Sequence, residues 1–482
     1  MKRNIIGRKN EIKRLQDYIS SNKSEFVAIY GRRRVGKTFL VKELFENQFT
    51  FRMTGRENAK LQDQLANFAY AMNDFYGENI KVENWTEAFY ALAKAIERQP
   101  VGVKIIFIDE LPWFDVQRSG FLSALEHFWN NWAFYRSDIK LIVCGSATSW
   151  MLNKVINARG GLHNRVTHRI SVSPFTLKET ELYFKSRGFV YERPEIISCY
   201  MAVGGVAYYL SLFENRKSVD ENIENLCFTN GGELIDEFNK LYTSLFKKAD
   251  SHLNIIRTLG TVGRGMSRLD IIEKTKLPNN GNLTTVLEEL EQCEFIRSYC
   301  PFGKSKKDKM FQLIDQFSLF HLRFIGNKSV FPKNYWTKLL GTPEYYSWCG
   351  YAFETLCLHH IDQIVDGLGI SGTINTPCSW IYRPNETERK SDDPDIRTGA
   401  QIDLLIDRND KTITVCEMKY SENEYSIDKS YDQHVQARLR TFRKVTGTNK
   451  TLTTAYITPQ GLFDNMYARR VGRQVTSEDL FE

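Results

Sequence analysis

Several features are missing from the 482-residue sequence, and each absence narrows the class of protein. The nine cysteines contain no CxxC pair, and the closest pairs, Cys293/Cys300 and Cys349/Cys357, have spacings typical neither of a zinc ribbon nor of a disulfide scaffold. There is no run of about 18 apolar residues to span a bilayer. Charges interrupt the N-terminal MKRNIIGRKNEIKRL, so no signal peptide is expected. These absences predict a cytoplasmic protein without membrane contact.

Low-complexity tracts and internal repeats are also absent. Hydrophobic residues make up 42% and aromatic residues 13% of the chain, which is enough for ordinary cores. A typical domain size of about 150 residues predicts about three domains. The net charge of +7 allows a nucleic-acid partner without requiring one, because only clustered charge makes a binding surface.

The first third of the chain alternates apolar, strand-like segments with helical patterns. The strand-like segments are 25–30, 104–109 and 140–145. Apolar strands alternating with helices are typical of an α/β fold with a parallel sheet covered on both faces. Beyond residue 175 the pattern is helical as far as residue 248.

Two further patterns follow. Three helical segments and two strands that flank the basic turn GKSKKDK (303–309) have the outline of a winged helix. A long helical stretch over 343–368 precedes two strands at 401–408 and 412–420 and a helix around 431–445. The polar segment 377–397 is expected to be a loop-containing insertion.

The strongest motif is GRRRVGKT, which matches the P-loop pattern between an apolar strand and a helix. Its glycines allow backbone N–H groups to point at phosphate oxygens, its lysine places a positive charge near the β- and γ-phosphates, and its threonine offers a hydroxyl to Mg²⁺. The sequence therefore predicts an ATP and Mg²⁺ site. The predicted nucleotide-binding residues of this loop are Gly31, Arg32, Arg33, Arg34, Val35, Gly36, Lys37 and Thr38.

An acidic pair supplies the partner of the P-loop. Asp109 ends the buried strand IIFID and is expected to hold Mg²⁺ together with Thr38. Glu110 follows and is expected to polarise the attacking water. At the end of the next strand, Ser146 is the candidate that senses the γ-phosphate, Ser149 is the alternative, and an ordinary strand-end turn explains both equally well.

Three arginines, Arg159, Arg165 and Arg169, lie where an arginine finger could come from the same chain or from a neighbouring copy, and Arg165 is the predicted nucleotide contact among them. Such a contact from a neighbour would imply a homo-oligomer. Most arginines in such a stretch face solvent, so no single assignment follows. The pair His359–His360 is expected on a helix surface, because no further His or Cys stands at ligand spacing.

The segments IIGRKNEIKRL, GRRRVGKT, FIDELPWFD, CGSATSWM and GGVAYYL together resemble the archaeal-type P-loop ATPases of the AAA+/STAND group, which are also widespread in bacteria. One branch of that group carries a winged helix and a C-terminal restriction-endonuclease-like domain. The resemblance implies that Gly7 and Arg8 lie at the turn of an adenine-binding segment, and that GGVAYYL is a lid motif with Ala207 where proline is common. It implies an AAA+ core over 1–175, a helical lid over 176–248, a winged helix over 249–330 and a nuclease-like α/β domain over 335–482.

The C-terminal strands carry a second candidate site. Asp403 lies on one strand, and Glu417 and Lys419 share a face of the next because side chains repeat every second residue. With Glu354 on the preceding helix, these residues resemble the PD-(D/E)xK nuclease pattern, in which Asp403 and Glu417 hold a metal and Lys419 steadies the attacking water. Glu-x-Lys is also common in ordinary strands, so a scaffold without catalysis stays open. Tyr431 and Gln433 are candidates to assist.

Three functions follow from these patterns. The first is an ATPase whose C-terminal domain cuts or grips DNA. The second is a STAND-like switch, in which ATP drives assembly and the C-terminal domain only binds a partner. The third is a DNA-binding regulator that uses the wing lysines Lys304, Lys306, Lys307 and Lys309. The helix at 282–293 carries three glutamates, which weighs against its insertion into a DNA groove.

Overall fold

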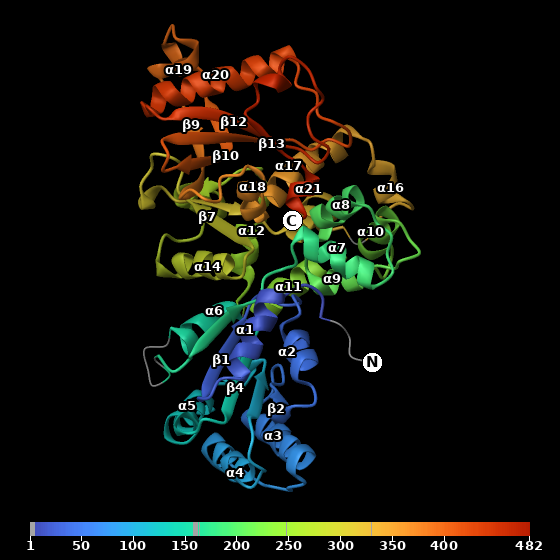
Figure 1. Ribbon diagram of the computed structural model, residues 1–482, viewed down its shortest axis with the longest axis vertical. Helices are drawn as coiled ribbons and strands as arrows, with labels where there is room; N and C mark the ends of the chain where they lie inside the picture. Colours follow the sequence, from blue (N-terminus) through green and yellow to red (C-terminus); the bar gives the residue numbers. More distant parts are fainter. Residues whose placement is uncertain (1–4, 158–161, 163, 247, 329) are drawn as a thin grey trace.

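The computed structural model describes residues 5–157, 162, 164–246, 248–328 and 330–482. The chain forms an elongated molecule (Figure 1). The N-terminal α/β part occupies the lower half of that view, and the helices and the second large sheet occupy the upper half. In the described parts of the chain, no helix is both long and apolar enough to cross a membrane.

The N-terminal sheet has five parallel strands in the order β2-β3-β4-β1-β5. They are β1 (Glu25–Tyr30), β2 (Phe49–Thr54), β3 (Lys104–Asp109), β4 (Ile139–Gly145) and β5 (His168–Ser171). The three expected strands form its centre, which confirms the predicted α/β fold with a parallel sheet. The edge strands were not predicted, because β5 has four residues and β2 exposes part of its length, so neither shows a continuous apolar run.

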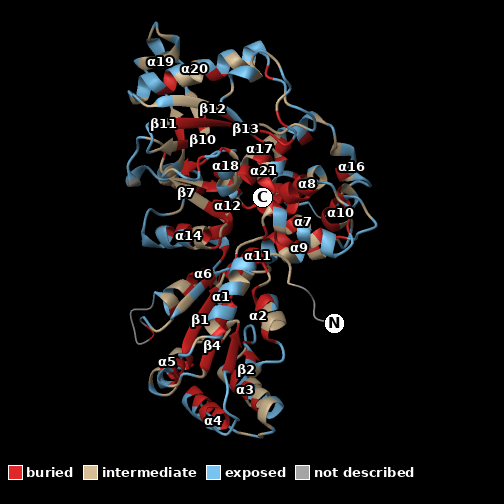
Figure 2. Cartoon of the chain, viewed as in Figure 1, coloured by how far each residue is buried: buried red, intermediate tan, exposed pale blue. Residues whose placement is uncertain are grey.

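Helices cover both faces of this sheet, and the alternation of side chains along β1 explains why. Phe26 and Ala28 belong to the core under one set of helices, whereas Val27 and Ile29 belong to the core under the other. The first set is α3 (Leu61–Tyr76), α4 (Trp85–Glu97) and α5 (Phe121–Asn131), and the second is α1 (Lys9–Ile19) and α2 (Lys37–Phe45). The strands are buried throughout their centres (Figure 2).

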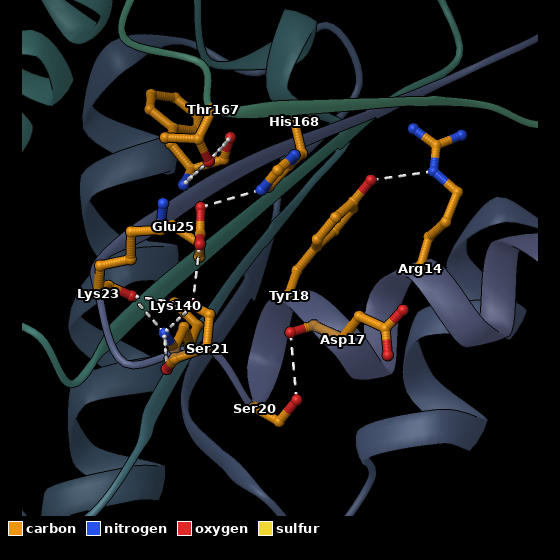
Figure 3. A network of polar contacts seen from close by, with 11 residues as sticks. Arg14, Asp17, Tyr18, Ser20, Ser21, Lys23, Glu25, Lys140, Thr167 and His168 are labelled. Atoms are coloured by element: carbon orange, nitrogen blue, oxygen red, sulfur yellow. Dashed lines mark hydrogen bonds and ion pairs between the residues drawn. The ribbon is translucent and has the colours of Figure 1, made fainter.

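A buried polar network closes the amino end of the sheet (Figure 3). The Lys140 side chain is fully buried, and its ammonium group donates to the Ser21 carbonyl at 2.8 Å and to the Ser21 hydroxyl at 2.9 Å. That hydroxyl donates to Glu25 at 2.8 Å, and the His168 Nε2 lies 3.2 Å from the same carboxylate. The His168 ring stacks on Tyr18. The network compensates the buried charges at the end of the sheet that is opposite to the P-loop.

The middle of the chain is helical apart from one small sheet. Its helices include α7 (Leu177–Ser186), α8 (Arg193–Val203), α9 (Ala207–Ser211), α10 (Val219–Cys227), α11 (Glu237–Leu245), α12 (Asp250–Gly260), α13 (Arg268–Thr275) and α14 (Gly281–Gln292). The small antiparallel sheet has the order β6-β8-β7, with β6 (Met266–Ser267), β7 (Ile296–Tyr299) and β8 (Met310–Leu313). The helix α15 (Gln316–Phe320) follows β8 directly.

The C-terminal sheet is mixed, in the order β13-β12-β11-β10-β9. Its strands are β9 (Asn375–Tyr382), β10 (Ala400–Arg408), β11 (Thr412–Met418), β12 (Thr451–Ile457) and β13 (Arg473–Val475). Neighbours in β9-β10-β11 are antiparallel, and those in β11-β12-β13 are parallel. The sheet is packed on both faces, with Leu404 and Ile406 in the core that includes α17 (Pro343–His359), and Ile402 and Leu405 in the core that includes α20 (Lys429–Thr446).

The segment 377–397 contains the expected loop, which lies between the end of β9 and the short helix α19 (Pro394–Arg397). The expected helical stretch over 343–368 is divided at His360 into α17 and α18 (Ile361–Gly367). His360 is 1% exposed rather than on the surface, since its Nδ1 bonds to the Leu356 carbonyl and its Nε2 accepts from the Leu177 N–H.

One hydrophobic core joins the expected lid, the three-helix unit with its hairpin, and the C-terminal helices. Buried side chains from Phe175 to Phe481 belong to this continuous core. The hairpin also docks on the C-terminal sheet: the Phe302 N–H donates to the Ser379 carbonyl at 2.7 Å, and the Phe302 ring packs 5.2 Å from the ring of Phe442. These parts are therefore held against each other by packing rather than separated by linkers.

Candidate functional site

The P-loop runs from the end of β1 into α2. Gly31 and Gly36 have φ values of 144° and 96°, which L residues with a side chain rarely adopt. A Cβ atom added at Gly31 would lie 2.2 Å from the Val172 carbonyl oxygen, so only glycine fits there. Lys37 is 5% exposed, burial lowers the pKa of its ammonium group, and the Nζ donates to the Arg32 carbonyl at 2.8 Å. The loop therefore presents its lysine at a helix N-terminus, where anions bind.

The threonine and the aspartate predicted to hold Mg²⁺ are brought together. The Thr38 hydroxyl donates to Asp109 Oδ1 at 3.0 Å, across the carboxyl ends of the central strands. Asp109 is 2% exposed, and burial raises the pKa of its carboxyl group. A hydroxyl and a carboxylate at this distance, beside a phosphate-binding loop, suit the oxygen ligands of Mg²⁺.

Glu110 and Ser146 also meet. Glu110 has a φ of 49°, in the left-handed region, so its side chain turns from the end of β3 toward β4. Its Oε2 accepts from the Ser146 hydroxyl at 2.8 Å and from the Ser146 N–H at 3.3 Å. Burial raises the pKa of Glu110, and the Lys37 charge and the Ser146 hydroxyl partly offset that effect. Ser149 is buried, and its hydroxyl has no hydrogen-bond partner among the described residues.

The segment before α1 lies against the P-loop. Arg8 is 6% exposed, its backbone N–H donates to Glu179 at 2.7 Å, and its guanidinium donates to the Val35 carbonyl at 3.3 Å. Gly7 has a φ of 63°, and a Cβ added there would lie 2.4 Å from the Glu179 carboxylate, which would have to shift. Residues 7 and 8 are thus adjacent to the loop, at the place where the resemblance puts an adenine-binding turn.

The GGVAYYL segment approaches the P-loop from the other side. The Tyr208 N–H donates to the Arg34 carbonyl at 3.2 Å, and the Arg34 guanidinium lies 4.3 Å from the centre of the Tyr208 ring. Arg34 also pairs with the buried Glu237 at the start of α11. Arg32 pairs with Asp315. Sequence reasoning missed these carboxylates, because nothing local marks a residue more than 200 positions away as a partner of the loop.

The three candidate finger arginines have different outcomes. Arg159 lies outside the described residues. Arg165 is wrong as a nucleotide contact in its own chain: its guanidinium lies 5.5 Å from the centre of the Phe134 ring, in the segment before β4. That position is at the amino end of the sheet, about 20 Å along the strands from the P-loop. The backbone carbonyl of Arg169, on β5, accepts a hydrogen bond from the Arg14 guanidinium at 2.7 Å.

A second set of predicted residues lines a cavity of about 430 Å³ in the C-terminal part. Glu354 comes from α17, Asp403 from β10, and Glu417 and Lys419 from the end of β11. Burial, and next the charge of Asp403, raises the pKa of Glu354 to about 8. In the described parts of the chain, no three His, Cys, Asp or Glu side chains lie close enough to share a metal ion.

Both carboxylate oxygens of Glu417 are engaged. Arg438 donates to Oε1, and the Tyr431 hydroxyl donates to Oε2 at 2.6 Å. The Lys419 ammonium lies 5.0 Å from the centre of the Tyr431 ring. Asp403 accepts from Gln401 at 2.5 Å. Tyr431 thus contacts the predicted set, whereas Gln433 does not line the cavity.

Helix α20 adds basic side chains that sequence reasoning did not select. His434, Arg438 and Arg440 line the cavity, and Arg440 pairs with Asp395 at 3.3 Å. The signal was present, because His434 and Arg438 stand three and seven residues after Tyr431 and therefore share its helix face. The wing lysines Lys304, Lys307 and Lys309 are exposed, and the Lys306 side chain lies outside the description.

Comparison with known proteins concerns the N-terminal part of the chain, which carries the first of these sites. Residues 5–213 match the family model described as an ATPase domain predominantly from Archaea. An uncharacterized protein of Methanocaldococcus jannaschii is 25% identical over 435 residues, which cover 89% of this chain and 90% of the relative. An uncharacterized ATP-binding protein of the same organism is 44% identical over 44 residues, 9% of this chain and 75% of the relative.

Solved structures are similar at a lower level. A Walker-type ATPase of Pyrococcus abyssi covers 66% of this chain and 96% of its own, with 16% identity and a TM-score of 0.49. The match to the Aeropyrum pernix ORC2 protein covers 66% of this chain and 93% of the ORC2 chain, with 13% identity and a TM-score of 0.42. The family match and the P-loop geometry together define an ATPase domain. That domain is the N-terminal part of this chain, and its P-loop lies between β1 and α2.

Proposed function

We propose that the protein is an Mg²⁺-dependent ATPase whose C-terminal part acts on nucleic acid as a nuclease. The observation that carries the nuclease proposal is the shared cavity, onto which Glu354, Asp403, Glu417 and Lys419 all open. Three carboxylates and a lysine that open on one cavity are the groups that phosphodiester cleavage requires.

In the ATPase domain, the proposed roles follow the contacts. Lys37 and the loop amides hold the phosphates, and Thr38 and Asp109 are the residues that would hold Mg²⁺, which supplies charge stabilisation when bound. Glu110 is the proposed base. It leaves Ser146 and orients the attacking water when the γ-phosphate is in place, so Ser146 couples the position of the base to the nucleotide.

In the C-terminal cavity, the carboxylate oxygens have the chemistry that a divalent cation prefers, but Glu354, Asp403 and Glu417 do not lie close enough together for all three to share one. Oxygen ligands suit Mg²⁺ or Mn²⁺, and a cation would relieve the repulsion between Asp403 and Glu354 that contributes to the raised pKa of Glu354. Arg438 and Arg440 line the cavity and provide positive charge for a phosphate backbone. We propose the exposed wing lysines as a further phosphate contact.

A second candidate function is a STAND-like switch, in which the C-terminal part binds a partner without cutting. The engaged carboxylate of Glu417 favours it, because Arg438 and Tyr431 already satisfy both oxygens without a metal. In that function, ATP binding changes assembly and hydrolysis resets it.

Cleavage assays separate the two functions. Plasmid and labelled single-stranded DNA are incubated with purified protein and Mg²⁺ or Mn²⁺, with and without ATP. Nuclease function predicts cutting that Asp403→Asn and Lys419→Ala abolish. Asp410→Asn, in the exposed β10–β11 turn, is the matched control and should cut normally. If the wild type cuts neither DNA nor RNA in any condition, while Mg·ATP changes its mass in solution, the switch is correct.

A regulator that binds DNA without cutting has a different signature. Its association constant for DNA would fall steeply as the salt concentration rises. A plot of log association constant against log salt concentration would have a slope of about −0.9 per phosphate contact. Replacing the four wing lysines by glutamine would reduce that slope. An unchanged slope would remove the wing from the nucleic-acid surface.

A further inference from the structure

The P-loop is tied to a residue 283 positions further along the chain. Arg32 Nη1 lies 2.5 Å from Asp315 Oδ1, and both side chains are buried, at 3% and 4% exposure. The guanidinium carbon lies 4.8 Å from the centre of the Phe295 ring. Phe295 and Asp315 flank the β7–β8 hairpin, so the partner of the loop comes from the element that also docks on the C-terminal sheet.

Asp315 is itself held in place by the protein. Its other oxygen, Oδ2, accepts from the Ser318 N–H at 2.9 Å and from the Ser318 hydroxyl at 2.6 Å, so the residue caps α15. The Ser318 hydroxyl lies 2.9 Å from the Tyr242 hydroxyl on α11. Because these bonds fix the carboxylate independently of the P-loop, Asp315 is a fixed anchor to which Arg32 attaches.

Arg32 in turn holds the catalytic lysine. Its carbonyl accepts the hydrogen bond from Lys37 Nζ, so the orientation of the Arg32 peptide sets the position of the ammonium group. A buried guanidinium that loses its carboxylate is strongly unfavourable. We expect Arg32 to move toward water in that case and to carry its carbonyl away from Lys37.

We propose that Asp315 is a positioning residue of the ATPase site, which acts on Lys37 through Arg32. The site is then complete only when the segment after the β7–β8 hairpin is seated on the P-loop. The pair Arg34–Glu237 is a second tie to the loop, but the Arg34 carbonyl bonds to Tyr208 and not to the lysine. Asp315 is therefore the carboxylate that reaches the phosphate-binding group.

The test is a double-mutant cycle on Mg·ATP affinity, measured by calorimetry on the full chain. Asp315→Asn removes the charge and keeps a residue that caps helices well. It should weaken Mg·ATP binding at least fivefold. Arg32→Gln should weaken it similarly, and the double variant should be no weaker than Arg32→Gln alone, because residues that act as a unit are not additive.

Asp220→Asn is the matched control. Asp220 is a partly buried carboxylate in the same helical half, bonded to the Trp336 indole N–H at 2.8 Å, and no hydrogen bond or ion pair joins it to the P-loop among the described residues. It should leave Mg·ATP affinity unchanged. If Asp315→Asn does not fold, Asp315→Ser also caps the helix and replaces it in the cycle. Unchanged affinity in a folded Asp315 variant would overturn the proposal. Independent, additive losses from Arg32 and Asp315 would overturn it as well, since they would show that Asp315 acts only on general stability.

Discussion

The Ser146 hydroxyl lies 2.8 Å from the Glu110 Oε2, so residues from the ends of two neighbouring strands form one unit at the ATP site. The contact joins the proposed catalytic base to the end of β4, the strand that lies beside the P-loop strand. Its consequence is electrostatic, because the hydroxyl stabilises the ionised carboxylate of Glu110 against the effect of burial.

Removing that hydroxyl should change the pH dependence of hydrolysis. In Ser146→Ala, the pKa of Glu110 rises further, so a higher pH is needed to ionise the base. Because this contact belongs to the nucleotide-free site, the acid limb of the kcat/KM–pH profile should move to higher pH, and kcat/KM near neutral pH should fall about 3- to 10-fold. Steady-state kinetics across pH 5–9 measure both. Ser149→Ala is the control, and an equal shift there would contradict the role of Ser146.

Two substitutions should separate nucleotide binding from hydrolysis. Lys37→Ala removes the ammonium group from the phosphates and should abolish detectable Mg·ATP binding. Glu110→Gln keeps the loop intact and should bind Mg·ATP within about twofold of the wild type, with kcat reduced about 100-fold. Calorimetry and a phosphate-release assay measure the two effects. Comparable loss of binding in both variants would contradict the assignment of Glu110.

His360 should make the fold sensitive to acid. Burial lowers the pKa of this imidazole to about 4, so the unfolded chain binds a proton more readily between that pH and about 6.5. The neutral imidazole of His360 contributes fully to the free energy of unfolding above pH 6.5. As the pH falls toward 4, that free energy decreases by an amount on the order of 3 kcal/mol. Thermal melts from pH 7.5 to 4.5 should show a smaller loss in His360→Asn than in the wild type. His127→Asn, on an exposed helix face, should leave the pH dependence unchanged.

Docking of the hairpin loop should depend on one ring. Phe302 packs on Phe442, and Phe302→Ala removes that contact while leaving the basic loop intact. Trypsin should then cleave between Lys304 and Lys309 several times faster, because the loop opens at a lower free-energy cost. Leu269→Ala, at an exposed position on α13, is the control. Equal cleavage rates in the wild type and Phe302→Ala would show that the ring does not hold the loop.

The C-terminal site shows how far strand alternation can predict contacts. Glu417 and Lys419 were expected on one face of their strand, and both open on the same cavity as Asp403 and Glu354. The partners of Glu417 were less accessible to prediction. Arg438 follows Glu417 by 21 residues and lies on α20. The orientation of α20 over the sheet depends on its packing against the core that contains Ile402, Leu405 and Phe442.

Local chemistry in the sequence determined the P-loop, the acidic end of β3 and the central strands, because glycine conformation, the P-loop pattern and continuous apolar runs leave few alternatives. The edge strands, the buried His360 and the place of Arg165 depended on neighbours distant in the chain, so only the tertiary structure decided them. The same holds for Asp315. An N-cap aspartate is ordinary in sequence, and only folding, which brings the end of the hairpin onto the loop, makes it the partner of Arg32.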